Sequence, residues 1–309
     1  MKVWDVAILV KAAVLVPGVA FAHVSQQGFV LLLPTDVYAI AGVAVVALTV
    51  VALFLLPGPA LHRLFEARRG PQFSFSRLRP ATSFLSFLLL SAMVYVGHFG
   101  PRDPLSNLMP LMFWTVGWIA LVSLTGFLGN LWRAINPWSW LLAMVPSRDA
   151  GPAPGPLPGC LLLLAFSAFL LADPAPDDPA RLARLAGFYW VAMSVLAIVA
   201  GPHWLERIEI GFVVSGAFGR LAPVGLSVGR FGTPGWNALE GSSWRGLSMV
   251  SLLLLGIGSF DGLNETFWWL GLIGVNPLEF PGRSAVIVPT LAGLFITNLA
   301  LIAAYAIAI

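Results

Sequence analysis

Long apolar runs alternate with short polar segments along almost the whole chain. Seven such runs are bounded by charged residues, proline or glycine, and several fall short of the roughly 20 residues that a straight membrane-crossing helix needs. They are Val37–Pro57, Ala81–Phe99, Leu108–Gly129, Gly159–Ala172, Leu185–Gly201, Leu247–Ser259 and Ala285–Ile309. The pattern predicts an all-α fold: a polytopic bundle of about seven transmembrane helices, with a further half-helix or interfacial helix at Trp138–Val145.

The first 22 residues have the pattern of an export signal. Lys2 precedes an apolar stretch that ends in Ala20-Phe21-Ala22, an A-x-A processing site. We therefore predict a signal peptide at residues 1–22 and a single helical transmembrane domain at residues 23–309. The alternative is an uncleaved signal anchor. In both cases His23 would lie on the outer side of the membrane.

The arginines between the apolar runs set the orientation. With the residue after Ala22 outside, the inner loops carry eleven arginines and the outer loops four. The inner ones are Arg63, Arg68, Arg69, Arg77, Arg79, Arg133, Arg148, Arg207, Arg220, Arg230 and Arg245. An excess of basic residues on the cytoplasmic side is the normal bias of inner-membrane proteins. The sequence therefore predicts a multi-pass protein of the bacterial inner membrane.

One inner loop contains a helical pattern of its own. Between Glu206 and Leu221 apolar residues recur at helical spacing, with Arg207, Glu209 and Arg220 mostly on another face. We predict a helix lying on the inner membrane surface. The alternative is an eighth, short span, which would bury Glu206 and Glu209.

Composition agrees with a membrane protein. Hydrophobic residues make up 58% of the chain and charged residues 10%, against roughly 25% charged in soluble domains. A net charge of +3 does not indicate nucleic acid, and the single Cys160 excludes an intrachain disulfide and a cysteine-rich metal site. The expected partners are the lipid bilayer and other membrane subunits, because the chain ends inside its last apolar run.

The predicted topology brings several ionisable groups to the outer side. Asp261 and Glu265 are four residues apart, so a helix would place both carboxylates on one face. The whole set is His23, Asp36, His98, Asp103, Asp261 and Glu265.

An imidazole with two or three carboxylates is a donor set for a metal ion that activates water. We predict His98, Asp261 and Glu265 as ligands of zinc or copper. His23 would join them once cleavage frees its amine, and Asp103 or Asp36 would orient water or act as a base. The structural alternative is that these acids only cap helices and turns.

Two weaker patterns suggest other functions. Gly225–Gly229 matches G-x-S-x-G, but a nucleophile elbow needs a later histidine, and none follows Ser227. Asn136-Pro137 and Asn276-Pro277 lie on opposite predicted sides, as paired broken helices of a transporter would. Turns that end helices explain them equally well.

Four strings resemble a family of bacterial polytopic membrane proteins described as fenitrothion hydrolase-like. They are HVSQQGFVLLLPT at residues 23–35, FLGNLWRAINPW at 127–138, GRLAP at 219–223 and SFDG at 259–262. The resemblance implies an organophosphate-triester hydrolase that works as a heteromeric membrane enzyme, with a partner supplying part of the site. It does not identify which acids or histidines act. The alternatives are a transporter or permease, and a structural or assembly subunit of a membrane complex.

Overall fold

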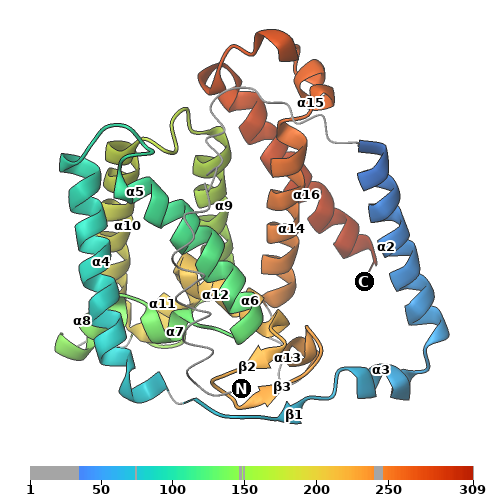
Figure 1. Ribbon diagram of the computed structural model, residues 1–309, viewed down its shortest axis with the longest axis horizontal. Coiled ribbons are helices and arrows are strands. Elements are labelled where there is room, and N and C mark those ends of the chain that lie inside the picture. Colours follow the sequence, from blue (N-terminus) through green and yellow to red (C-terminus); the bar gives the residue numbers. More distant parts are fainter. Residues whose placement is uncertain (1–34, 74, 146–147, 149, 240–245, 309) are drawn as a thin grey trace, which may run out of the picture. The chain divides into compact units, whose positions relative to one another are not determined.

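The computed structural model describes residues 35–73, 75–145, 148, 150–239 and 246–308, and Figure 1 shows their helices and strands. By internal contacts the chain divides into two units, Met1–Leu33 and Pro34–Ile309. The predicted signal segment and His23 belong to the first unit and lie outside the described residues.

Five described helices are long and apolar enough to cross a membrane. Three of them are single elements: α4 (Arg79–Phe99), α10 (Pro179–Ala200) and α14 (Leu247–Asn264). The fourth is one continuous helix made of α5 (Leu108–Pro110), η2 (Leu111–Ala120) and α6 (Leu121–Leu128). The fifth is made of η4 (Arg283–Val286) and α16 (Ile287–Ala308). The other two predicted runs form α2 (Thr35–Leu55) and α9 (Leu157–Ala172), whose described apolar parts are shorter. The all-α prediction is confirmed, and the count of seven spans stays a prediction.

Short elements connect these helices. The helical ones are α3 (Gly58–Leu64), η1 (Phe75–Arg77), α7 (Trp132–Ile135), α8 (Trp138–Met144), α11 (Pro202–Ile208), α12 (Ile210–Leu221), α13 (Trp236–Leu239), α15 (Phe267–Leu272) and η3 (Pro277–Glu279). The strands β1 (Arg68–Arg69), β2 (Val224–Gly225) and β3 (Arg230–Phe231) form a small antiparallel sheet in the order β1-β3-β2. This sheet and α11 lie at one end of the bundle and α15 at the other (Figure 1).

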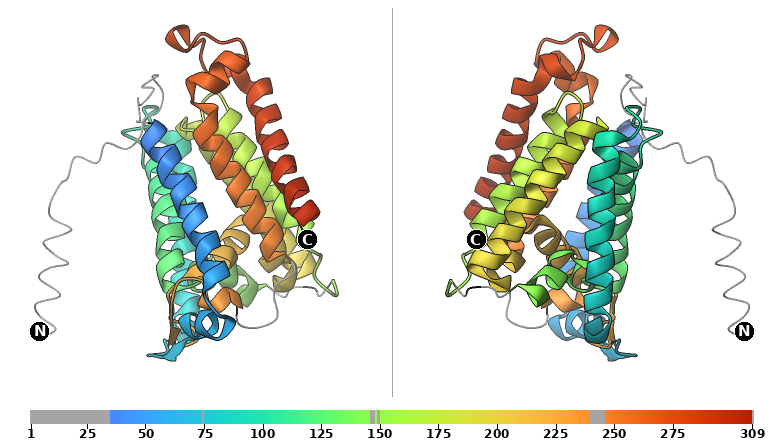
Figure 2. Two further views of the ribbon diagram at one scale, coloured as in Figure 1. Left: turned by 90° about the vertical axis from the view of Figure 1, so that its right-hand side faces the viewer. Right: turned by 90° about the vertical axis from the view of Figure 1, so that its left-hand side faces the viewer.

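Two sets of helices make the bundle, and α12 packs between them. In the first set α4 packs on α10 and α8, and in the second α14 packs on α16 and α9 (Figure 2). α12 contacts α6, α9 and α14. The largest core cluster accordingly joins Val213 of α12 to Leu163 of α9, Val250 of α14 and Leu294 of α16.

Small residues allow the closest helix contacts. A Cβ added at Gly97 of α4 would lie 2.6 Å from the Cβ of Ala183 in α10. In the same way, a Cβ at Gly293 of α16 would lie 2.3 Å from the ring of Phe260 in α14. Membrane helices associate mainly through such packing, because lipid provides no hydrophobic driving force between them. These glycines therefore fix how closely the helix pairs approach.

The predicted helix between Glu206 and Leu221 exists, but it is broken. α11 ends at Ile208, and Glu209 is extended (φ −68°, ψ 131°) before α12 starts at Ile210. Phe212, Val213 and Val214 are buried, so α12 packs into the bundle along much of its length. Glu209, which was predicted to lie on the polar face of a surface helix, is instead buried and only 2% exposed.

Candidate functional site

The helix ends that carry the predicted ligands lie at one end of the bundle. His98 is in the last turn of α4, Asp261 is in the last turn of α14, and Glu265 follows directly after that helix. In Figure 1 both helix ends, and the start of α2 with Asp36, lie at the end where α15 is found. We call this the outer end, and the end with the small sheet the inner end.

The predicted ligands do not complete a metal site by themselves. His98 is half-buried, whereas Asp261 and Glu265 are exposed. Within the described part of the chain, no group of three or more His, Cys, Asp or Glu side chains is arranged to hold a metal ion. His23 lies outside that part, and only the backbone of Asp36 is described. Since the described residues alone do not fit a metal ion, no reaction step through a metal is assigned to them.

Asp103 is engaged in its own turn. Its carboxylate accepts hydrogen bonds from the backbone N–H of Leu105, at 3.2 Å, and from the hydroxyl of Ser106. The Ser106 hydroxyl first, and then the Leu105 N–H, lower the pKa of Asp103. These contacts are those of a turn-forming aspartate. The predicted role as a base stays a prediction.

Arg283 donates hydrogen bonds to backbone carbonyls and attracts two aspartates at the outer end. Its Nη2 donates to the carbonyl oxygens of Leu170 and Leu171, at 2.7 and 2.8 Å, in the last turn of α9. Its charge also attracts Asp177 and Asp261. Burial raises the pKa of Asp177, and the Arg283 charge lowers it in part. A cation at a helix C-terminus satisfies otherwise unpaired carbonyl groups, so Arg283 has a structural role here.

The most elaborate polar arrangement lies at the inner end, around Glu209. Oε1 accepts hydrogen bonds from the N–H of Gly211 (2.8 Å) and the hydroxyl of Tyr189 (2.9 Å). Oε2 accepts from the N–H of Phe212 (2.9 Å) and from Nε1 of Trp132 (2.8 Å). One carboxylate therefore connects α7, α10 and α12. We call these five residues the Glu209 cluster.

Glu209 also begins α12. As the N-cap it satisfies two backbone N–H groups, and its negative charge faces the positive end of the helix dipole. Burial raises the pKa of Glu209, while the backbone donors, Tyr189 and Trp132 lower it. Gly211 is required for the approach of Trp132, because an added Cβ would lie 2.3 Å from the indole ring.

The sequence analysis did not identify this cluster. The sequence feature that could have indicated it is an acidic residue between two isoleucines, Ile208-Glu209-Ile210, directly before an apolar helical pattern. An acidic N-cap at that point breaks the helix, and a carboxylate flanked by branched apolar residues is a candidate for burial with hydrogen-bond partners.

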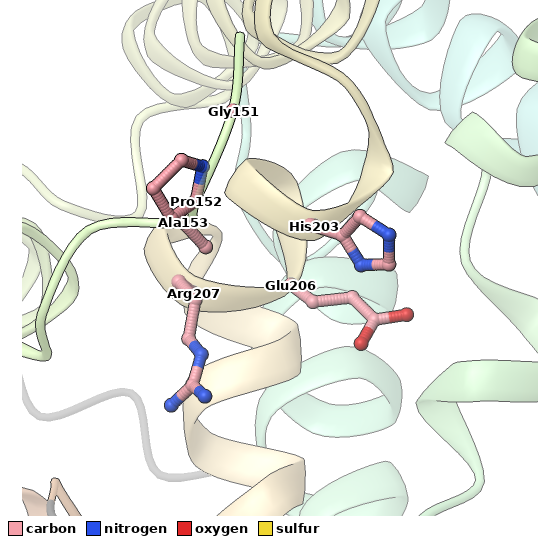
Figure 3. A pocket seen from close by; sticks show the side chains of 6 residues that line it. All are labelled: Gly151, Pro152, Ala153, His203, Glu206 and Arg207. Atoms are coloured by element: carbon pink, nitrogen blue, oxygen red, sulfur yellow. The ribbon is translucent and has the colours of Figure 1, made fainter. Parts of the chain in front are cut away.

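A pocket of about 540 Å³ opens beside α11, also at the inner end. Figure 3 shows its lining residues, with His203 and Glu206 projecting from the same side of α11. Glu206 forms a 3.7 Å ion pair with Arg133 of α7. The sequence analysis did not single out His203, although a histidine three residues before a glutamate on a helix places both on one face. The pocket brings an imidazole, a carboxylate and the Arg207 side chain to the inner end.

The weaker motifs have structural explanations. The segment Gly225–Gly229 comprises the last residue of β2 and the turn that leads to β3, so it is not the strand-to-helix turn of a nucleophile elbow. Asn136 accepts from the backbone N–H of Ser139 at 3.0 Å, and Asn276 accepts from that of Leu278 at 3.1 Å. Both asparagines therefore stabilise the turns in which they occur.

No protein-family model, no curated protein and no solved structure matches this chain. The resemblance to fenitrothion hydrolase-like proteins therefore stays a prediction.

Proposed function

We propose that the chain is a subunit of a metal-dependent hydrolase embedded in the bacterial inner membrane. It would contribute His98, Asp261 and Glu265 to a site at the outer end, and the remaining groups would come from His23, Asp36 and a partner subunit. The substrate class would be a lipophilic organophosphate triester, as the family resemblance implies.

The observation that carries the proposal is the common end reached by α4 and α14. His98 and the two carboxylates are far apart in sequence, yet their helices end on the same side of the bundle. Asp261 and Glu265 are exposed there, so their oxygens are accessible to a partner or ligand. No group of three or more such side chains is arranged to hold a metal ion within the described residues, so the proposed site would be completed only by groups from outside them.

The apolar surface supports a membrane complex. In the apolar windows of the five long helices, between 6% and 28% of the residues are buried. Every described side chain of α2 except Ala52 is exposed, with Val43, Leu48 and Phe54 among the most exposed. The exposed residues follow one another without a break from Ile40 to Val51, which is more than three helical turns, so α2 offers apolar surface all round. Such surface is covered by lipid or by another membrane protein.

The test is elemental analysis of the full chain purified in mild detergent, alone and with copurifying subunits. We expect zinc or copper, together with triester hydrolysis, in the complex and neither in the isolated chain. His98→Ala should reduce metal content and activity of the complex without dissociating it. His62→Ala, which changes a histidine of α3, is the matched control and should leave both unchanged. A complex whose metal content is the same with and without His98 would contradict the proposal.

A further inference from the structure

The residues between α14 and η4 form a cap at the outer end, which we call the α15 cap (residues 265–282). Trp269 and Leu270 of α15 are buried, and the ring of Trp269 lies edge-on to that of Phe260 in α14, with 5.1 Å between the ring centroids. The hydroxyl of Thr266 accepts a hydrogen bond from the N–H of Trp269 at 3.2 Å. One face of α15 is therefore anchored on the bundle.

The rest of the α15 cap is apolar but exposed. Trp268 is 65% exposed and Leu278 is 86% exposed. Phe267, Leu272 and Phe280 are exposed as well. A helix at a protein surface usually carries polar residues on its outer side, so an anchored helix with an apolar outer side indicates that another molecule covers it.

The α15 cap is also acidic. Glu265 and Glu279 are exposed, and neither forms a salt bridge with a described residue. Residues 247–282 contain no lysine, arginine or histidine, and the next basic residue, Arg283, donates to the carbonyls at the end of α9. Helices that lie on a bilayer surface typically carry Lys or Arg beside their apolar face. The charge of the cap therefore favours a basic protein surface over a lipid surface as its cover.

The position of the α15 cap favours a protein too. In Figures 1 and 2, α15 lies further out than the outer ends of α4 and α10. The apolar side chains of the cap are therefore not level with the apolar lengths of those helices, where lipid acyl chains would lie. Aromatic residues, tryptophan in particular, are typical of the centres of protein interfaces, and charged residues are typical of their rims. The cap contains both kinds of residue.

We propose that the α15 cap is a docking surface for the outer segment of a partner protein that presents an apolar centre and a rim of Lys or Arg. The cap begins at Glu265 and directly follows the last turn of α14 with Asp261. This partner is therefore the subunit that the proposed function requires, and the inference deepens that function. Complementary charge would orient the partner beside the two carboxylates.

The experiment uses the full chain in the membrane of the cells that produce it, with the photoreactive residue p-benzoylphenylalanine in place of Trp268. Irradiation should give one protein adduct, and mass spectrometry should locate the crosslink in a partner segment that carries a net positive charge. The matched control has the same photoreactive residue in place of Leu105, which is 67% exposed in the outer loop after α4. It should not give this adduct.

A charge reversal tests the complementarity. Glu279→Lys, combined with the photoreactive residue at position 268, should reduce the yield of the adduct about ten-fold, because like charges would then face each other. Glu66→Lys makes the same change at an exposed residue of the inner end and should alter the yield by less than about two-fold.

Several results would overturn the docking surface. An adduct with the mass of a phospholipid would assign the cap to the membrane, and one with the mass of two copies of the chain would assign it to self-association. The absence of an adduct at position 268, equal adducts at positions 268 and 105, a partner segment without net positive charge, or equal yields for the two charge reversals would also contradict it.

The crosslink requires neither a metal nor hydrolysis, so the two proposals can fail separately. A basic partner crosslinked at position 268 in a complex without metal would support the docking surface and contradict the proposed function. A complex that contains metal but gives no adduct at position 268 would do the reverse.

Discussion

The two ends of the bundle use their acidic side chains in opposite ways. At the inner end, Glu209 is 2% exposed and accepts four hydrogen bonds from three helices. At the outer end, Asp103 and Asp261 are exposed, and neither is enclosed by a comparable set of donors within the described residues. The inner carboxylate is fully occupied by the protein, whereas the outer ones keep oxygens accessible.

The difference shows why burial has to be considered before function. A buried carboxylate is costly unless every lone pair direction is satisfied, and satisfying it joins segments that are distant in sequence. An exposed carboxylate has no such requirement and can exchange water for a metal or a partner. We therefore assign a structural role to Glu209, whereas the binding role proposed for Asp261 and Glu265 stays a prediction.

The largest expected effect is at Glu209. In Glu209→Gln an NH2 group replaces one carboxylate oxygen and faces the two groups that donated hydrogen bonds to that oxygen. The substitution should therefore lower the free energy of unfolding by about 3 kcal/mol. Thermal unfolding in mild detergent measures the change. Glu206→Gln is the matched control, because its half-exposed ion pair with Arg133 should contribute less than about 1 kcal/mol. Equal effects of both substitutions would contradict a special role for the buried carboxylate.

The same variant gives a pH test. Because burial raises the pKa of Glu209, the folded state holds this proton more tightly than the unfolded state. The stabilisation of the folded state that comes from protonating Glu209 is complete at pH values below the pKa of the unfolded chain. It is lost as the pH rises through the pKa of Glu209 in the folded chain. The difference in unfolding free energy between the wild type and Glu209→Gln should therefore be larger near pH 4 than at pH 7. A difference that is larger at pH 7 than near pH 4 would mean that the hydrogen bonds lower the pKa of Glu209 more than burial raises it.

Tyr189→Phe should have the next largest effect. The Tyr189 hydroxyl donates to Glu209 and accepts the backbone N–H of Ile210 at 2.9 Å, so its removal leaves a partly buried N–H without an acceptor. We expect a loss of about 2 kcal/mol in the free energy of unfolding. Tyr95→Phe, at a side chain that is 64% exposed on α4, should cause almost no change. A similar loss in both variants would indicate a general effect of the hydroxyl group.

Arg283→Gln tests the outer end and should cost about 1 kcal/mol, because its two hydrogen bonds to carbonyls of α9 lie near the surface. The unfolding measurement is the same. The control is Arg102→Gln, which changes an exposed arginine at the same end. If Arg283→Gln destabilised the protein more than Glu209→Gln, the contrast between the two ends would be wrong.

Asp103→Asn should have the smallest effect, since asparagine forms the same kind of turn. The pKa of Asp103 is lowered, so its contribution to stability is present above the ordinary aspartate pKa and is lost as pH falls through the lowered value. The melting temperatures of the variant and the wild type should agree at pH 7, with any gap closing at acidic pH. A large gap at pH 7 would show that Asp103 has contacts beyond its own turn.

Much of the helical arrangement was predictable, and the reason for the main error is specific. Each predicted apolar run coincides with a helix, because long apolar runs leave a membrane protein few other structures. Residues 206–221, however, were treated as one continuous helix. The extended conformation at Glu209 interrupts it and resets the helical phase, so a face assigned from Arg207 does not continue to Glu209.

The sequence by itself determined the class of protein and the positions of its apolar helices, since hydrophobicity is a local property of each segment. Only the tertiary structure decided which polar groups meet. Glu209 accepts a hydrogen bond from Trp132, 77 residues away, and Gln72 donates to the carbonyl of Ser227, 155 residues away. Such partners are selected by the packing of whole helices and strands, which no local pattern specifies.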